Sequence, residues 1–226
     1  MILSIDQVLT TEQRQLFQKL LQEAEWEDGK KTAGHLAAKI KNNQQLADHH
    51  PLSQQLGEAL LGLLSKNPNF LAATLPAKIF PPRFNRYENT GHYGNHIDSA
   101  ILSVANTPHR VRSDISATLF LSDPDDYEGG ELIIEDFEHP KTVKLAAGSL
   151  ILYPSTSLHR VTPVTKGTRF AAFFWIQSLI RQDSQRRLLY TLDQTIQNLA
   201  TEQTKQHHLD QLTGVYHNLL RQWSNT

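Results

Sequence analysis

The sequence contains no cysteine, and Met1 is its single methionine. The lack of thiols excludes disulfide scaffolds, iron–sulfur clusters, cysteine-ligated zinc and thiol nucleophiles. A metal bound by this chain must therefore be held by histidine, aspartate or glutamate, and the 226 residues include eleven histidines. A chain without cysteine is also compatible with a reducing compartment, and we expect a cytoplasmic location.

Long apolar runs and an excess of one charge are missing as well. No stretch reaches the roughly 18 apolar residues of a transmembrane helix, and the N-terminal MILSIDQVLTTEQ lacks the basic and apolar segments of a secretory signal. The 22 basic and 23 acidic residues give a formal net charge of −1. We therefore expect neither a membrane nor a nucleic acid as a partner.

Three regions follow one another along the chain, and the first, residues 1–77, reads as mainly helical and as packing on the core. Thr10 and Gln13 have the spacing of a capping box, and apolar residues then recur on one helical face. A second helix is expected to start near Pro51 and to stop at Asn67-Pro68, because the residue before proline disfavours helix.

The second region, residues 78–178, changes to short β-prone runs that are separated by turn signals, without helical patterns between them. This pattern predicts an antiparallel barrel or sandwich, which would form the core domain. We expect strands at residues 83–88, 92–97, 115–121, 131–135, 141–144, 149–153, 160–164 and 168–176.

The third region, residues 179–226, returns to helical spacing of apolar residues. One stripe runs from Leu188 to Leu199 and another from Leu209 to Trp223, which predicts two amphipathic helices. These helices either pack on the β core or form the interface of a homodimer. The fold class expected for the whole chain is therefore α+β, with a mainly β core and flanking α-helices.

Candidate metal ligands lie in the β-rich region. His96 and Asp98 are two residues apart, so on a strand both side chains would point to the same face. His159 precedes a later predicted strand and is the best third candidate. Two histidines and one carboxylate form the ligand set of non-haem Fe(II) oxygenases, and they leave coordination positions open. Zinc accepts the same ligands, so the sequence alone also allows a zinc hydrolase.

Arg169 follows His159 by ten residues and opens the apolar strand FAAFFW. A guanidinium inside a barrel is costly unless it is paired, and bidentate pairing with the distal carboxylate of 2-oxoglutarate would suit it. An exposed arginine beside the preceding Lys166-Gly167 turn is an equally good reading of the spacing.

These residues stand in runs that resemble a known family. The run RYENTGHYGNHID at residues 86–98 resembles the iron-binding segment of prolyl and lysyl hydroxylases. The runs GGEL at residues 129–132, LHRV at 158–161 and GTR at 167–169 resemble later segments of the same enzymes. In length and flanking regions, the whole chain resembles the bacterial PKHD-type hydroxylases, which are often linked to iron uptake.

The resemblance implies a double-stranded β-helix (jelly roll), Fe(II), 2-oxoglutarate as cosubstrate and L-ascorbate as an activating reductant. It also implies iron ligation by His96, Asp98 and His159 and pairing of Arg169 with 2-oxoglutarate. Tyr87 matches a tyrosine that can form a hydrogen bond to the cosubstrate in related enzymes. The reaction implied is hydroxylation of a substrate, either a protein or a small molecule, with release of succinate and CO2; the identity of the substrate is not implied.

Two alternatives keep the same ligands. A nucleic-acid repair dioxygenase would require a basic groove and a second arginine close behind Arg169, whereas the next arginine is Arg181. A non-catalytic sensor barrel would bind iron or 2-oxoglutarate without turnover. The roles of His92, His109 and Glu131 stay open between contacts near the site and ordinary loop or surface positions.

Overall fold

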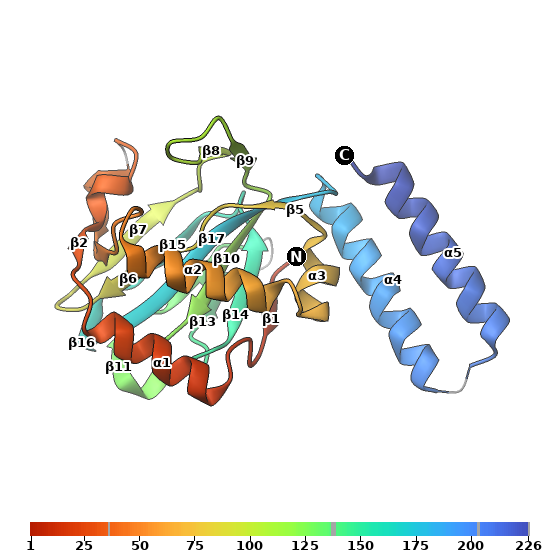
Figure 1. Ribbon diagram of the computed structural model, residues 1–226, viewed down its shortest axis with the longest axis horizontal. Coiled ribbons are helices and arrows are strands. Elements are labelled where there is room, and N and C mark those ends of the chain that lie inside the picture. Colours follow the sequence, from red (N-terminus) through yellow and green to blue (C-terminus); the bar gives the residue numbers. More distant parts are fainter. Residues whose placement is uncertain (36, 137–138, 203, 226) are drawn as a thin grey trace.

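The computed structural model describes residues 1–35, 37–136, 139–202 and 204–225 (Figure 1), so residues 203 and 226 of the expected C-terminal region lie outside the described residues. Its centre consists of two antiparallel sheets. The larger sheet has the order β1 (Leu3–Ile5), β14 (Leu150–Pro154), β10 (Ile115–Phe120), β17 (Arg169–Ser178), β6 (Arg83–Tyr87), β4 (Gln44–Gln45) and β2 (Glu27–Asp28), with β5 (Pro76–Ile79) also on β17.

The smaller sheet has the order β13 (Lys141–Val143), β12 (Leu132–Ile134), β15 (His159–Val161), β7 (His92–His96) and β3 (Lys41–Asn42). Two further strand pairs are β11 (Tyr127–Gly129) with β16 (Val164–Gly167), and β8 (Ile101–Ser103) with β9 (Arg110–Arg112). Apolar residues from both main sheets bury one another in a shared cluster, which includes Tyr87, Phe120, Leu132, Tyr153 and Val161. The two sheets therefore face each other across a common interior.

Helices α1 (Thr11–Gln22), α2 (Pro51–Leu64) and α3 (Pro68–Thr74) lie on the outer face of the larger sheet (Figure 1). Phe17 of α1 and Leu60 of α2 are buried in the same cluster as Phe174 of β17. The capping box expected at the start of the first helix is present, with Thr10 accepting from the Gln13 amide. The mainly helical N-terminal region thus covers one side of the β core, and it also contributes the strands β1 to β4.

Helices α4 (Asp183–Thr201) and α5 (Gln206–Trp223) form an antiparallel pair that projects from one end of the sheets (Figure 1). This pair confirms the two amphipathic helices expected at the C-terminus. Within the described residues, no helix combines the length and the apolar character needed to cross a membrane.

Residues 41–45 close one edge of the interior. Strand β3 pairs with β7 of the smaller sheet, and β4, two residues further on, pairs with β6 of the larger sheet. The short segment Lys41–Gln45 therefore bridges the two sheets.

Most expected strands are confirmed within one or two residues, but one expected strand was wrong in detail and one helix was not expected. The expected strand 160–164 is divided into β15 and β16, which pair with different partners, because Pro163 between them has no amide hydrogen to donate. The Asn67-Pro68 stop does end α2, yet it also starts α3. The Asn67 side chain accepts from the Phe70 amide, and proline fits the first helical position.

Candidate active site

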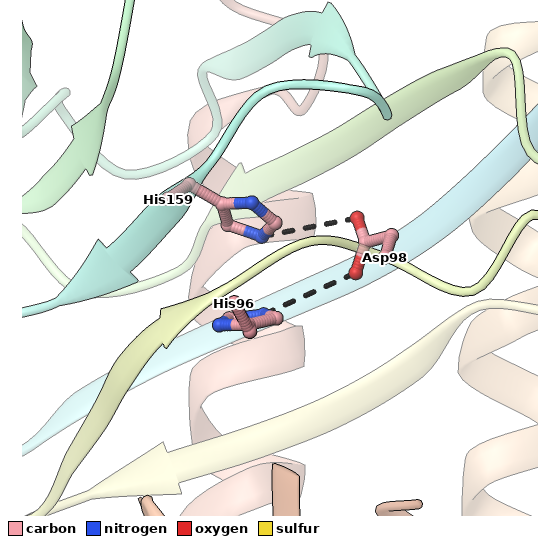
Figure 2. Close-up of side chains that lie close together, drawn as sticks. All are labelled: His96, Asp98 and His159. Atoms are coloured by element: carbon pink, nitrogen blue, oxygen red, sulfur yellow. Dashed lines mark ion pairs between the residues drawn. The ribbon is translucent and has the colours of Figure 1, made fainter. Parts of the chain in front are cut away.

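His96 and His159 are brought together by strand pairing. His96 is the last residue of β7 and His159 the first residue of β15, and the two are direct partners in the antiparallel register. Their ring centroids are 4.1 Å apart. The carboxylate of Asp98 lies beside both rings (Figure 2), 4.0 Å from His96 Nε2 and 3.8 Å from His159 Nε2. One potential ligand atom from each of the three side chains lies within 4.8 Å of the others.

Both imidazole rings are oriented by the main chain. His96 Nδ1 lies 2.8 Å from the Gly94 carbonyl oxygen, and His159 Nδ1 lies 3.0 Å from that of Ser157. A carbonyl only accepts, so Nδ1 carries the proton and Nε2 keeps its lone pair. In the described part of the chain, neither Nε2 has a hydrogen-bond partner. This is the tautomer that metal-bound histidine adopts when its second nitrogen is anchored.

Asp98 is placed by a loop and not by a strand, which corrects the expected geometry, since β7 ends at His96. Its position is fixed by hydrogen bonding instead. The Ser116 hydroxyl of β10 donates to Asp98 Oδ2 over 2.6 Å, and Ser155 Oγ lies 2.8 Å from Ser116 Oγ. The carboxylate is thereby held toward the two histidines by the larger sheet.

Aromatic side chains surround the histidines. Tyr93 stacks on His96 with a centroid distance of 3.6 Å, and Tyr153 meets His159 edge-on at 5.1 Å. Burial, and then the neighbouring His159, lower the pKa of His96 to about 4. His96 is therefore neutral at physiological pH, which is the form that binds a metal.

The triad opens into a cavity of about 430 Å³ between the sheets. Arg169 also lines this cavity, and its side chain is 1% exposed, so the reading of an exposed arginine was wrong. The guanidinium lies 5.2 Å from the Tyr87 ring and 5.1 Å from that of Phe120. In the described residues, no carboxylate lies within salt-bridge distance of Arg169, and its Nε has no hydrogen-bond partner.

Tyr87 and Arg169 are placed side by side by their strands. Tyr87 ends β6, Arg169 begins β17, and the two are direct register partners. Tyr87 lines the cavity as well. Burial raises the pKa of the Tyr87 phenol, which keeps it protonated and able to donate a hydrogen bond. A buried cation and a phenol donor therefore share one wall.

Three residues whose roles were open in the sequence lie outside the cavity lining. His92 begins β7, and its Nδ1 lies 3.0 Å from the Thr90 carbonyl oxygen. His109 is exposed in the turn between β8 and β9. Glu131 accepts a hydrogen bond from the Thr162 hydroxyl, which lowers the pKa of this carboxyl group. The structure gives each of these side chains a local partner or a surface position.

Family comparisons agree with this geometry. Residues 82–177 match the family model of the 2OG-Fe(II) oxygenase superfamily, and residues 183–225 match that of the PKHD-type hydroxylase C-terminal domain. A PKHD-type hydroxylase from Parvibaculum lavamentivorans is 58% identical over 226 residues, which cover 100% of both chains. The chain belongs to the PKHD-type hydroxylases. The PKHD-type hydroxylase PiuC of Pseudomonas aeruginosa is 52% identical over 224 residues, with 99% of each chain covered.

Solved structures show the same fold for this PKHD-type hydroxylase. A prolyl hydroxylase from Trichoplax adhaerens has a TM-score of 0.55 at 16% identity and covers 83% of this chain and 86% of its own. A Pseudomonas putida prolyl-4-hydroxylase has a TM-score of 0.53 at 18% identity, covering 78% and 92% respectively. The expected α+β fold with a jelly-roll core is confirmed, and the chain is a 2-oxoglutarate-dependent Fe(II) dioxygenase.

The site of this PKHD-type hydroxylase fits the metal and cosubstrate of its family. Two Nε2 lone pairs and a carboxylate converge, and a buried arginine lacks an acidic partner. Sequence reasoning missed Ser116, Tyr93 and Lys41, which also line the cavity. Strand β10 has two polar residues, Ser116 and Thr118, among apolar ones, and this was the signal available for Ser116.

Proposed function

We propose that His96, Asp98 and His159 hold Fe(II) and that Arg169 and Tyr87 bind 2-oxoglutarate in a hydroxylase reaction. The observation that carries this proposal is the pairing of two features in one cavity. A triad of free ligand atoms lies on one part of the wall, and a buried, unpaired guanidinium lies on another. Either feature alone would fit other chemistry, whereas together they match a metal and a dicarboxylate.

The protein's own groups have separable tasks in this proposal. Bound Fe(II) would supply the activation of O2 and the oxidative decarboxylation of 2-oxoglutarate to succinate and CO2. Arg169 neutralises the distal carboxylate of the cosubstrate through its planar pair of donors. The centre of the Tyr87 ring lies 5.2 Å from the Arg169 guanidinium. The Tyr87 phenol donates a hydrogen bond to the same ligand. The buried walls exclude bulk water from the reacting atoms.

The direct test is succinate release from 2-oxoglutarate, measured with added Fe(II) and O2, together with the bound metal content. Asp98→Ala and His159→Ala are expected to lose tight metal binding and succinate release together. His92→Ala is the matched control, because His92 lies on the same strand as His96 but outside the cavity lining. Metal-replete wild-type protein that binds no 2-oxoglutarate would overturn the proposal.

The alternatives predict other outcomes of the same assays. A sensor barrel would bind iron and 2-oxoglutarate in stoichiometric amounts without forming succinate in the presence of any substrate. A nucleic-acid repair enzyme would bind single-stranded DNA at physiological salt and turn over on it. A zinc hydrolase would lose no activity when iron is replaced by zinc.

Two further parts of the proposal concern conditions. We propose that L-ascorbate acts as an activating reductant, and its addition is expected to raise the number of turnovers before inactivation. We also propose a cytoplasmic location, for which the cysteine-free sequence is the support. Cell fractionation that finds the protein outside the cytoplasm would contradict the second part.

A further inference from the structure

A strip of polar side chains faces the interior where the chain bridges the two sheets. Lys41, Asn43 and Gln45 alternate with the less buried Asn42 and Gln44, as expected for an extended segment with one face inward. The three inward residues are 5%, 6% and 2% exposed. Lys41 and Asn43 line the same cavity as the metal triad. A lysine and two amides are costly to bury without full pairing, so this strip requires an explanation.

Lys41 is the second unpaired cation of the cavity. Its Nζ lies 3.3 Å from Thr32 Oγ1, 3.3 Å from Gln45 Oε1 and 5.4 Å from the centre of the Tyr93 ring. All these partners are neutral, and in the described residues no carboxylate lies within salt-bridge distance of it. Burial lowers the pKa of Lys41 to about 8, with nearby Arg83 lowering it further and Asp28 and Asp48 opposing, so the amine is mainly protonated at neutral pH.

Arg83, a third cation that lines the cavity, shows the contrast. Its guanidinium is paired with Asp48, with Arg83 Nε 3.0 Å from Asp48 Oδ1. The described residues therefore supply a carboxylate within salt-bridge distance for Arg83 and none for Lys41 or Arg169. Since buried charges are normally paired, both of the remaining cations are arranged to meet anions that come from outside the chain.

Amide side chains of the strip, and that of Asn85, the register partner of Gln45, also have buried atoms without hydrogen-bond partners among the described residues. Both polar atoms of the Asn43 side chain, Gln45 Nε2 and Asn85 Oδ1 are buried and have no hydrogen-bond partner among the described residues. Asn85 lines the cavity and is 7% exposed. Buried polar groups in native proteins are nearly always satisfied, so a group of unsatisfied ones indicates a polar binding site.

We propose that Lys41, with Asn43 and Asn85, forms a subsite that binds a carboxylate group of the hydroxylated substrate. This inference rests on the proposed function, in which Arg169 is occupied by 2-oxoglutarate and only Lys41 is free for a second anion. The cavity of about 430 Å³ must hold the cosubstrate as well. It lies near the lower end of the range of ligand pockets, roughly 300–1,000 Å³. The substrate class is therefore a small carboxylic acid, with the side chains of Leu102, Phe173 and Trp175 lining the cavity for its carbon skeleton.

The subsite can be tested with acetate, before the substrate is known. Full-length protein with [ε-¹³C]lysine is loaded with Zn(II) and saturating 2-oxoglutarate, and the Lys41 signal is identified as the one missing in Lys41→Met. Acetate is expected to shift this signal saturably, with a dissociation constant on the order of 10 mM for so small a ligand. Acetamide, the neutral analogue, is expected to leave it unchanged.

Control variants separate this test from that of the proposed function. Arg169→Met is expected to lose 2-oxoglutarate affinity and to keep the acetate shift of Lys41. Lys166→Met is the matched lysine control, because Lys166 is exposed on β16, and it is expected to keep both. Calorimetry of 2-oxoglutarate binding in the same samples shows whether the proposed function fails independently. A Lys41 signal that does not respond to acetate up to about 100 mM, or responds equally to acetamide, overturns the inference.

Turnover provides a second test. Any compound that stimulates succinate release is expected to lose about tenfold or more in kcat/KM when its carboxylate is converted to a primary amide. The same loss is expected for the unmodified compound with Lys41→Met, and Lys41→Arg is expected to recover part of it. A stimulating compound that carries no anionic group would overturn the inference.

Discussion

Ser116 donates a 2.6 Å hydrogen bond to Asp98 Oδ2 and so connects the larger sheet to the carboxylate of the triad. Asp98 follows the end of β7 and has no strand to fix it. The Ser116 hydroxyl, and not backbone pairing within a strand, therefore holds the Asp98 carboxylate in position. It donates to Oδ2, the oxygen that lies 3.8 Å from His159 Nε2, whereas Oδ1, 4.0 Å from His96 Nε2, is not used by this hydrogen bond.

Removal of this hydroxyl is expected to weaken metal binding. Ser116→Ala should lower metal affinity by about 10–100-fold, the usual effect of losing a group that orients a ligand. Metal titration of the variant measures this. Ser122→Ala is the matched control, because Ser122 is a buried serine with two hydrogen bonds of its own, to Thr168 and Phe170. Equal metal affinity in both variants would show that Asp98 is held in another way.

Replacement of Arg169 should separate folding from cosubstrate binding. Arg169 is buried without an acidic partner, so Arg169→Met is expected to leave the metal-free protein at least as stable as wild type. Its affinity for 2-oxoglutarate should fall by about thirtyfold or more, because truncation of a buried charged partner costs about 2–5 kcal/mol. Thermal unfolding with and without 2-oxoglutarate measures both effects. Stabilisation by 2-oxoglutarate equal to that of wild type would contradict the assignment.

Gly130 sets the space around Arg169. Its φ is +68°, and a Cβ there would lie 2.8 Å from Val164 Cγ2 and 3.0 Å from Arg169 Cδ. Gly130→Ala is expected to cost about 1–3 kcal/mol in stability and to weaken 2-oxoglutarate binding, since the guanidinium must move. Gly62→Ala serves as the control, because Gly62 lies in α2 with open space around it and should gain up to about 1 kcal/mol. Denaturant unfolding compares the two.

The stability contribution of Lys41 should depend on pH in a defined direction. Burial lowers its pKa to about 8, whereas the unfolded chain keeps the proton up to about 10.5. Unfolding therefore takes up a proton between these values, so the Lys41 contribution to stability rises as the pH rises. The stability of Lys41→Met relative to wild type should accordingly decrease by up to about 3 kcal/mol between pH 7 and pH 11. A pH-independent difference in urea unfolding would contradict the lowered pKa.

The C-terminal helices are expected to form a homodimer. Leu188 of α4 and Val215 of α5 are 59% and 50% exposed, and no residue of α5 is fully buried. A second copy would cover these exposed apolar side chains. Sedimentation equilibrium should show a dimer for wild type and a monomer for the double variant Leu188→Glu/Val215→Glu. A wild-type monomer at high concentration would refute this expectation.

Much of the secondary structure could be predicted because its signals are local. The capping residues at Thr10 and Gln13, the turn signals between strands and the helical spacing after residue 179 all act within a few residues. The strands β1 to β4 were not predicted from the sequence, because a strand of two or three residues has no measurable periodicity. They form only where an existing sheet offers an edge, as β3 and β4 do beside β7 and β6.

The candidate triad shows where prediction from sequence stops. His96, Asp98 and His159 were expected as ligands, and the structure brings all three together. The expected reason was partly wrong, since Asp98 is placed by Ser116 and not by strand alternation. Sequence spacing alone allowed Arg169 to be either buried or exposed. In the structure Arg169 is buried, because β17 lies between β10 and β6 in the larger sheet.

The sequence by itself determined the chemistry available to this protein. Without cysteine, metal ligation is left to histidine and carboxylate, and the motif runs pointed to iron and 2-oxoglutarate. The tertiary structure decided which groups meet. The registers of His96 with His159 and of Tyr87 with Arg169, and the inward face of Lys41, depend on pairing between segments far apart in the chain. Such pairing is fixed by the burial of whole sheet faces, which no local pattern specifies.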